Sequence, residues 1–307
     1  MPEPRTAASR WIDLCDPDAD ALRAALPTAV HETAFARIMR PAHHDDEPRP
    51  RLVAHGDYVF GVLAFPTLTA DGAVFQEVDV VATLDALVTI RKTPEPHTAC
   101  EFDDVRNAAL RENSSPGLCL YALVDEIAER FLDIIDRFDD SIDDLEDHVT
   151  EWPSSQVRSL ISSTRHDILH VRRVLAPTRD AARAVLDDRV ELDGDTSLFP
   201  RDIELRFADA YDKLLRATDG LDLARDLLAG VRDFHQAEVA NDQNEVMKRL
   251  TVVASVLLLP TFIVGLYGQN FKHIPELGFH QGYAFVWALI IGTTAVQLWY
   301  FRRKHWI

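Results

Sequence analysis

The sequence predicts an α+β domain followed by a long stalk helix and a two-helix transmembrane hairpin. Three observations predict this arrangement: two long uncharged stretches near the C-terminus, a helical pattern before them, and short strand-like segments near the N-terminus. The chain of 307 residues is long enough for a soluble core and a membrane segment. Most of the chain is charged and acidic, whereas about the last sixty residues are strongly apolar.

The composition excludes several functional classes. The formal net charge is -18, and no basic tract is long enough to bind nucleic acid. The three cysteines Cys15, Cys100 and Cys119 are scattered, which fits a reducing compartment rather than a disulfide framework. The N-terminus lacks the apolar segment of a signal peptide. Without a Gly-rich phosphate loop, nucleophile elbow or HExxH motif, we expect no enzyme and no ATP-driven transport in this chain.

The predicted soluble part has two regions. Residues 1–115 form a mixed domain, with a helix over 18–26 and strands over 58–65, 76–81 and 86–91. Residues 116–199 form a helical hairpin whose first helix has an acidic face.

The acidic face belongs to a strongly charged run of the sequence. Residues 101–150 hold fifteen Asp or Glu and four Arg. Two interpretations stay open: a solvated helix face, or a surface that concentrates cations.

The predicted stalk helix covers residues 200–249 and continues towards Tyr267 with no internal proline before Pro260. Roughly 60 helical residues span about 90 Å at the usual rise. Such a length fits helices arranged around the axis of an oligomer better than a compact monomer.

The predicted membrane spans are residues 250–267 and 283–301, eighteen and nineteen residues without a charge. Each is long enough to cross a hydrocarbon core of about 30 Å. The loop 268–282 is nearly neutral, and the tail 302–307 is basic. Because Lys and Arg flank the spans on the side of the termini, both termini are expected in the cytoplasm, in a multi-pass protein of the cytoplasmic membrane.

A stripe with 3-4 spacing runs along the first span. It consists of Asn244, Met247, Thr251, Ala254, Leu258, Thr261 and Gly265. Two helices cannot enclose a water-filled pore, so a conducting hairpin must place one helix per subunit around a symmetry axis. The stripe either lines such a pore or packs against a neighbouring helix, since small residues also favour membrane helix contacts. Val252, Val256, Leu259 and Ile263 lie on other faces and suit lipid or neighbouring helices.

The junction of the two spans carries a family motif. Gly268-Gln269-Asn270, followed by Pro275-Glu276-Leu277, resembles the Gly-Met-Asn signature and Pro-Glu-Leu loop of the CorA family of magnesium channels. The similarity covers nearly the whole chain and is strongest over residues 205–307. It implies a CorA-like homo-oligomer, a pentamer in the lipid bilayer, that admits Mg²⁺ and also Co²⁺ passively.

The resemblance also implies roles for individual residues. Asn270 is the selectivity asparagine, in a filter with Gly268 and Gln269, and Asn244 is a deeper polar ring. Mg²⁺ sheds water reluctantly, so amide and carbonyl oxygens can accept hydrogen bonds from its hydration shell. The implied hydrophobic constrictions are Met247, Leu250 and Leu258. Leu250 lies one position off the stripe, next to Thr251. One of these two residues must therefore lie further from the pore axis than the other.

Three carboxylates outside the membrane spans are candidates for a role in cation binding. Asp209 matches a regulatory aspartate at a subunit interface, where bridging Mg²⁺ holds the closed state, and Asp212 is a neighbour that could share this role. Either residue could equally be an ordinary surface carboxylate. Glu276, in the loop between the spans, attracts cations or is a solvated loop charge.

The sequence departs from the signature at Gln269, where the family has methionine. Zinc transporters of the ZntB type also vary at this position, so a transporter of Zn²⁺ or other transition metals is an alternative. A non-conducting membrane scaffold is a further alternative, motivated by the same departure.

Overall fold

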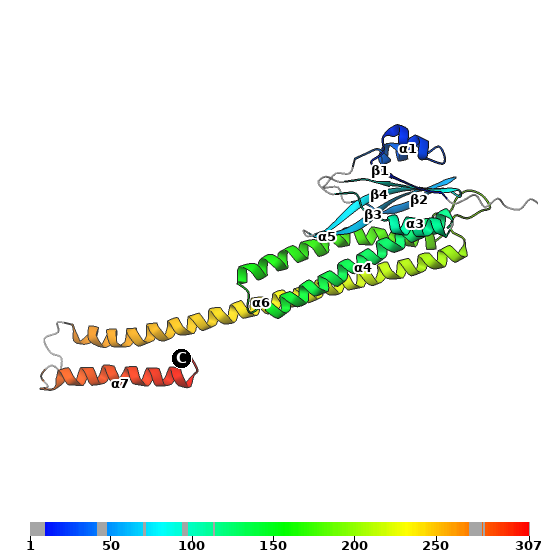
Figure 1. Cartoon of the computed structure of the whole chain (residues 1–307). Helices are drawn as coiled ribbons and strands as arrows, with labels where there is room; N and C mark the ends of the chain where they lie inside the picture. The colour runs from blue at the N-terminus through cyan, green and yellow to red at the C-terminus, as the bar shows by residue number, and fades with distance from the viewer. Residues whose placement is uncertain are drawn as a thin grey trace, which may run out of the picture. The chain divides into compact units, whose positions relative to one another are not determined.

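The computed structural model describes residues 10–41, 48–69, 72–93, 98–112, 114–269, 278 and 280–306. The chain divides into two compact units, Met1–Val231 and Arg232–Ile307, and each is described by itself. Figure 1 shows the order of the elements. The strands are β1 (Arg10–Cys15), β2 (Arg51–His55), β3 (Tyr58–Thr69), β4 (Gly72–Ala82) and β5 (Ala86–Arg91). The helices are α1 (Ala19–Ala25), α2 (Glu32–Ile38), α3 (Asp103–Arg111), α4 (Pro116–His148), α5 (Ser154–Leu186), α6 (Arg201–Tyr267) and α7 (Gly282–Arg303).

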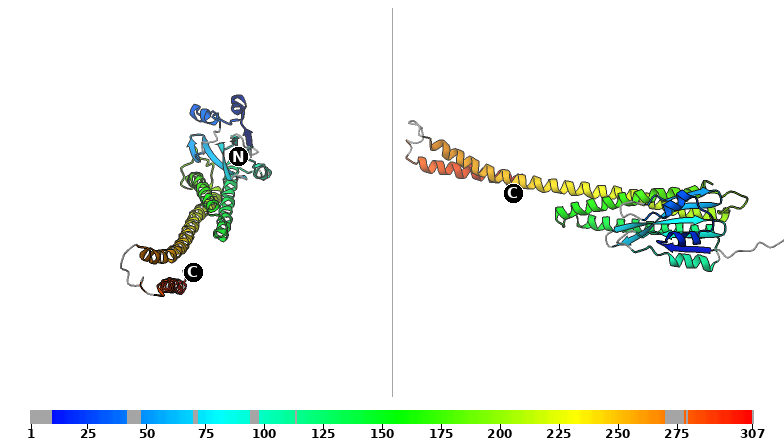
Figure 2. Two further views of the ribbon diagram at one scale, coloured as in Figure 1. Left: turned by 90° about the vertical axis from the view of Figure 1, so that its left-hand side faces the viewer. Right: turned by 90° about the horizontal axis from the view of Figure 1, so that it is seen from above.

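The first unit is built on a five-stranded sheet of order β1-β5-β4-β3-β2. β1 pairs with β5 in parallel, and the other neighbouring strands are antiparallel. Helices cover both faces, with α1 and α2 on one side and α4 and α5 on the other (Figures 1 and 2). Two hydrophobic clusters result, a small one under α1 and α2 and a large one between the sheet and the long helices.

The predicted N-terminal elements are confirmed, and others were missed. The helix predicted over 18–26 is α1, where the Asp18 carboxylate accepts a hydrogen bond from the Ala21 amide at 2.7 Å. The three predicted strands are present, and β3 and β4 extend further, to 12 and 11 residues. β1 and β2 were not predicted as strands. Nine consecutive residues of β3 are buried because helices cover both faces of the sheet.

The continuous helix predicted from about Pro200 to Tyr267 is confirmed by α6. It has 67 residues and contains Pro260, so the proline does not end it. At 1.5 Å per residue this length is about 100 Å. In the first unit, two rows of buried side chains hold α6 on its neighbours. Successive members of each row are seven residues apart. The rows are Ile203, Ala210, Ala217, Ala224 and Val231, and Phe207, Leu214, Leu221 and Leu228.

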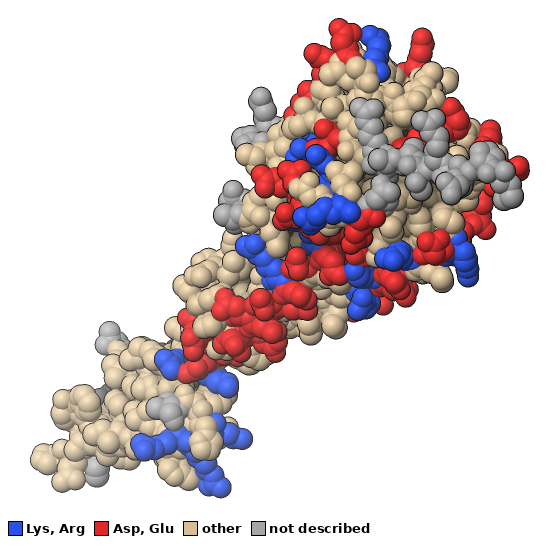
Figure 3. Space-filling view, turned by 45° about the vertical axis from the view of Figure 1, so that its right-hand side comes forward, with Lys and Arg blue, Asp and Glu red and all other residues tan. Residues whose placement is uncertain are grey.

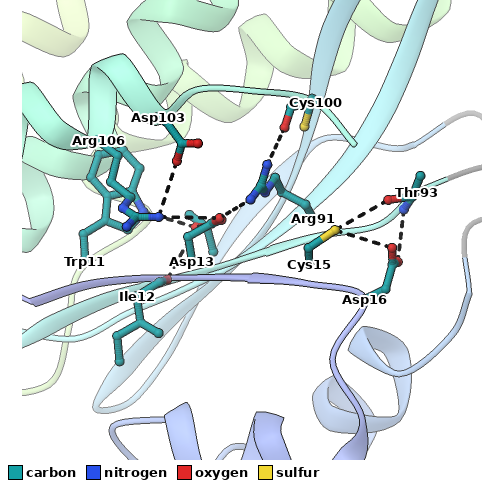
Figure 4. Close-up of polar contacts among 11 residues, drawn as sticks. Trp11, Ile12, Asp13, Cys15, Asp16, Arg91, Thr93, Cys100, Asp103 and Arg106 are labelled. Carbon is teal, nitrogen blue, oxygen red and sulfur yellow. Dashed lines mark hydrogen bonds and ion pairs between the residues drawn. The ribbon is translucent and has the colours of Figure 1, made fainter. Parts of the chain in front are cut away.

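An ion network ties the edge of the sheet to α3 (Figure 4). Asp13 on β1 lies 2.6 Å from Arg91 on β5 and 3.7 Å from Arg106 on α3. Asp13 also accepts a hydrogen bond from Thr89 at 2.7 Å, and Trp11 donates to Thr89 at 3.1 Å. Because Asp13 is almost fully buried, these partners offset the cost of removing its charge from water.

A second buried cluster surrounds Lys92, just after β5. Its ammonium lies 2.6 Å from Glu77 and 2.7 Å from Asp79, both on β4, and donates to the carbonyl oxygen of Arg37 at 3.2 Å. Asp79 is fully buried, and its Oδ1 has no hydrogen-bond partner among the described residues. Burial raises the pKa of Asp79 from 3.8 to about 6, although the charge of Lys92 acts in the opposite direction.

The Asp79→Asn variant should therefore change the pH dependence of stability. A raised pKa means that the folded state binds the proton more tightly than the unfolded state. The contribution of Asp79 to stability is present below pH 3.8 and is lost as the pH rises to about 6. We expect the melting temperature of Asp79→Asn, relative to the wild type, to be higher at pH 7.5 than at pH 4. Thermal melts of the purified full-length protein measure this difference. The exposed Asp85→Asn is the matched control, and a difference that does not vary with pH would contradict the expectation.

Candidate functional site

The membrane hairpin belongs to the second unit, in which α7 lies alongside the C-terminal part of α6 (Figures 1 and 2). Two described helices, α6 and α7, are long and apolar enough to cross a membrane. Val252 and Ile263 of α6 are buried, with 7% and 6% of their surface exposed. Gln297 of α7 donates a hydrogen bond to the carbonyl oxygen of Ser255 at 3.3 Å. The face of α6 around Val252, Ser255 and Ile263 therefore packs on α7. A neighbouring helix was one of the two surroundings expected for this face, and lipid was the other.

The stripe along α6 lies on the opposite side from α7. All the stripe residues are exposed, and Leu258 reaches 71%. The stripe residue Gly265 has no atom within 4 Å of the position that a Cβ would take. Since successive helical residues are about 100° apart, Gly265 lies about 200° from the buried Ile263. Leu250 is also exposed, at 59%, so both Leu250 and Thr251 are accessible.

Two threonines, with Asn244, make the stripe partly polar. The Thr251 hydroxyl donates to the Met247 carbonyl oxygen at 2.8 Å, and the Thr261 hydroxyl donates to the Leu257 carbonyl oxygen at 2.6 Å. Each hydroxyl proton is therefore used inside the helix, and the oxygen lone pairs remain as acceptors. Such a surface can accept hydrogen bonds from the water around a cation.

The helix α6 ends at Tyr267, where Gly268 begins the motif of the junction. The Gly268 amide donates to the Val264 carbonyl oxygen at 2.8 Å. A Cβ at Gly268 would lie 3.0 Å from that oxygen, which is closer than most side chains tolerate. This approach explains a glycine at the end of the helix. Gln269 follows and is exposed, whereas Asn270 and Glu276 lie outside the described residues.

Positive charge gathers at one end of the hairpin (Figure 3). Lys248 and Arg249 precede the apolar part of α6, and Arg302, Arg303 and Lys304 end α7 or follow it. The Arg303 guanidinium lies over the Trp299 ring, 5.5 Å from its centroid. The hairpin therefore has one basic end and a largely apolar remainder.

Asp209 and Asp212 line one open hollow of about 620 Å³ in the first unit. The other lining residues are Tyr121, Lys213, Leu215, Arg216 and Asp219. Both carboxylates are exposed, and neither has an ion-pair partner within 4.0 Å among the described residues. Nowhere among the described residues do three or more His, Cys, Asp or Glu side chains lie together so that they could hold a metal ion. Two carboxylates supply fewer oxygen ligands than a hard divalent cation takes, so these two alone would not complete the shell of such an ion.

Lys213 is a residue of this hollow that the sequence did not single out. Its ammonium lies 2.7 Å from Asp125 and 2.6 Å from Glu129, both on α4. Burial alone would lower the pKa of Lys213, but the hydrogen bonds to the two carboxylates outweigh it and raise the pKa. Lys213 therefore stays charged, joins α4 to α6 and places a fixed positive charge beside Asp209 and Asp212.

The acidic run lies on the exposed side of α4. Ile142 and Leu145 are buried, and Asp140, Asp143, Asp144 and Asp147 are exposed between and around them. Figure 3 shows acidic side chains gathered into a patch on this view of the molecule. Burial and then the charges of Asp136, Asp143 and Asp140 raise the pKa of Asp139. The exposed positions are those expected of a solvated face, and the cation-concentrating role is still untested.

Comparison with known proteins identifies the family. Residues 6–303 match the family described as CorA-like Mg²⁺ transporter protein. The chain belongs to this CorA-like family. A cobalt/magnesium transport protein CorA from Thermotoga maritima is 27% identical over 84% of this chain and 73% of its own length. The complete structure of the CorA magnesium transporter from Methanocaldococcus jannaschii matches with a TM-score of 0.78 and 21% identity. That match covers 97% of this chain and 91% of the archaeal chain.

The CorA-like fold therefore covers both units of the chain and includes its two candidate membrane helices. The ZntB cytoplasmic domain from Vibrio parahaemolyticus matches more distantly, with a TM-score of 0.55 and 16% identity. That match covers 78% of this chain and 93% of the ZntB domain and shows a shared fold. The matched family is one of membrane transporters, and α6 and α7 are the two candidate membrane spans among the described residues.

Proposed function

We propose that the protein is a homo-oligomeric, passive channel that admits Mg²⁺, and also Co²⁺, across the cytoplasmic membrane. Family membership supports the ion class, because the matched family and the Thermotoga relative are named for Mg²⁺ and for cobalt and magnesium. The resemblance implies five subunits. The basic end of the hairpin supports a cytoplasmic position for both termini, since Lys and Arg are retained on that side.

One observation carries the proposal: the stripe of α6 faces away from α7. If α7 occupies one side of α6, the opposite side is free to face a symmetry axis shared by several copies. That side carries Asn244, two threonine hydroxyls and Gly265, with Met247 and Leu258 between them. Polar rings separated by apolar rings allow an ion to enter and leave without binding too tightly.

The proposed filter is Gly268, Gln269 and Asn270 at the end of this stripe. Backbone carbonyls near Gly268 and the Asn270 amide oxygen would accept hydrogen bonds from hydrated Mg²⁺. Glu276 in the following loop would add a negative charge that attracts cations to the entrance.

Ion flux into liposomes tests the proposed function. Purified full-length protein is reconstituted, and uptake of Mg²⁺, Co²⁺ and Zn²⁺ is measured under an imposed membrane potential. A negative interior favours entry by about 2.3 kcal/mol per charge per 100 mV, hence by twice that for a divalent ion. Uptake of Mg²⁺ without ATP supports the channel, and absence of any divalent flux would leave the non-conducting scaffold.

The second candidate is a ZntB-like transporter of Zn²⁺ or related metals. Gln269 favours it, because this position departs from the CorA signature. In the same liposomes, this candidate requires faster uptake of Zn²⁺ than of Mg²⁺.

We also propose that Asp209 and Asp212 hold regulatory Mg²⁺ between subunits. Their exposure and shared hollow support this role, because a neighbouring copy could complete the ligand shell. Without the ion, carboxylates facing one another across an interface would repel and bias the assembly away from its closed state. With the ion bound, the repulsion is offset.

The Asp209→Ala variant should lose protection by magnesium. In the wild type, Mg²⁺ bound between copies should slow cleavage of the soluble part of the full-length protein by added protease. We expect the variant to need a magnesium concentration at least about tenfold higher for the same protection, which corresponds to about 1.4 kcal/mol of binding free energy. The exposed Asp202→Ala, on the first turn of the same helix, is the matched control. Unchanged protection in Asp209→Ala across magnesium concentrations would contradict the role.

A further inference from the structure

Helix α5 carries four arginines spaced seven residues apart, Arg158, Arg165, Arg172 and Arg179, called the arginine row below. Three residues after each arginine comes a buried residue of α5. These buried residues are Ile161, Ile168, Leu175 and Ala182. Because the buried row has the same spacing, the arginine row keeps to one flank of the helix along its length. Arg158, Arg165 and Arg172 are exposed.

Helix α6 carries an opposite row at the same spacing. The aspartate row consists of Asp219 and Asp226. Each follows a buried alanine, Ala217 or Ala224, by two residues. At about 100° per residue, this position lies on the far side of α6 from its core contacts. Both carboxylates are exposed.

The two rows have only exposed or adjacent partners within the described part of their own chain. Arg158, Arg165 and Asp219 have no ion-pair partner within 4.0 Å there, whereas Arg179 pairs with its neighbour Asp180 at 3.1 Å and Asp226 with its neighbour Arg225 at 3.0 Å. Arg172 lies 3.5 Å from Asp222, and both side chains are about half exposed. Exposed pairs of this kind contribute less than about 1 kcal/mol each, so the rows are largely unsatisfied.

An exposed leucine occupies the same place in both rows. Leu169 lies between Arg165 and Arg172 with 41% of its surface exposed, and Leu223 lies between Asp219 and Asp226 with 56% exposed. The two segments therefore share one pattern, in which a charged residue is followed by leucine after four residues and by the same charge after three more. Seven helical residues rise about 10.5 Å, so the two patterns match in length.

We infer that the arginine row of one copy docks on the aspartate row of a second copy, with Leu169 against Leu223. Complementary charges fix the partner and the register, and burial of the two leucines supplies the apolar contact. Charges lie four residues before and three residues after each leucine, so Leu169 can meet Leu223 in parallel or antiparallel docking with a charge offset of about 1.5 Å in the antiparallel case. The inference rests on the proposal that the protein is a homo-oligomer.

Cysteine cross-linking tests the contact in the full-length protein. The exposed Cys15 is first replaced in a Cys15→Ser background, since Cys100 and Cys119 are buried. The double variant Leu169→Cys/Leu223→Cys is oxidised with copper phenanthroline, which takes two electrons from the two thiols to form one disulfide. We expect denaturing gels without reductant to show species of two or more copies. A disulfide within one chain would leave the mass unchanged.

Leu160→Cys/Leu223→Cys is the matched control. Leu160 is exposed to 37% on the same helix but lies about 200° around it from Arg158. We expect at least about tenfold less cross-linked product from the control than from the Leu169 pair. Equal cross-linking of the two pairs would overturn the inference.

Charge reversal supplies a second measurement that does not depend on cysteine chemistry. Arg165→Glu/Arg172→Glu should weaken the oligomer, and adding Asp219→Arg/Asp226→Arg should restore it, as measured by sedimentation in detergent at low salt. If every charge variant forms normal oligomers and the Leu169→Cys/Leu223→Cys variant gives no cross-link between copies, the docking inference is overturned. The proposed oligomeric channel would still stand. A single-copy particle in the wild type would overturn the proposed oligomeric channel as well.

Discussion

Asn270→Ala should abolish magnesium-dependent growth rescue of a host that lacks its own magnesium uptake. Each subunit would lose one amide oxygen that accepts hydrogen bonds from the hydration shell of the ion. A hydrogen bond to a charged partner contributes about 1.5–3 kcal/mol. Loss of one such bond therefore lowers the rate of ion passage by about 10–100-fold. Because every copy around the axis loses its oxygen, we expect a loss at the upper end of this range.

The matched control for this prediction is the neighbouring amide. Gln269→Met restores the family signature, and we expect it to keep rescue. If Gln269 sets the choice of metal, this variant should also raise uptake of Mg²⁺ relative to Zn²⁺ in liposomes. Rescue by Asn270→Ala at the wild-type level, with equal amounts of protein in the membrane, would remove Asn270 from the filter.

The sequence predicted the C-terminal part of the fold best. The uncharged stretches and the 3-4 stripe are local signals, and the structure places the stripe away from α7 and Val252 and Ile263 against it. The end of α6 at Tyr267 was also predicted, and the helix continues through Pro260 although a proline removes one backbone hydrogen bond. The filter itself stays a prediction, since Asn270 lies outside the described residues.

Strands that depend on distant partners were harder to predict. β1 pairs with β5 in parallel from Arg10–Ala86 to Cys15–Arg91, so its partner is more than seventy residues away. β2 has five residues, and Arg51, Val53 and His55 are exposed, which leaves too little apolar pattern to identify it. Such strands form because a sheet edge is already present, and this information is tertiary.

The hollow beside Asp209 shows the same limit for a functional site. Its aspartates were chosen from the family resemblance, but Lys213 and its contacts with Asp125 and Glu129 join residues more than eighty positions apart. The one local signal was the spacing of Asp125 and Glu129, four residues apart on a single helix face. Nothing in that spacing indicated that a lysine of α6 would meet both carboxylates.

Gly265→Leu should block ion flux without weakening the protein. A Cβ at Gly265 meets no atom within 4 Å in one chain, and leucine favours a helix over glycine by about 0.8 kcal/mol. The hairpin should therefore fold at least as well as in the wild type. If the stripe surrounds an axis, however, one added leucine from every copy converges on the pathway and closes it. We expect uptake of Mg²⁺ into liposomes to fall at least about 100-fold, while the melting temperature stays the same or rises.

Ala295→Leu separates this steric effect from a general effect on the hairpin. Ala295 is exposed on α7. Its enlargement adds similar bulk to the other helix and should leave uptake within about twofold of the wild type. If Ala295→Leu blocks Mg²⁺ uptake and Gly265→Leu does not, the pathway lies along α7 rather than α6. That outcome would contradict the proposed pore. A block by Gly265→Leu alone would assign the stripe to the pathway rather than to contact between neighbouring helices, because tight helix packing would lower the melting temperature of that variant.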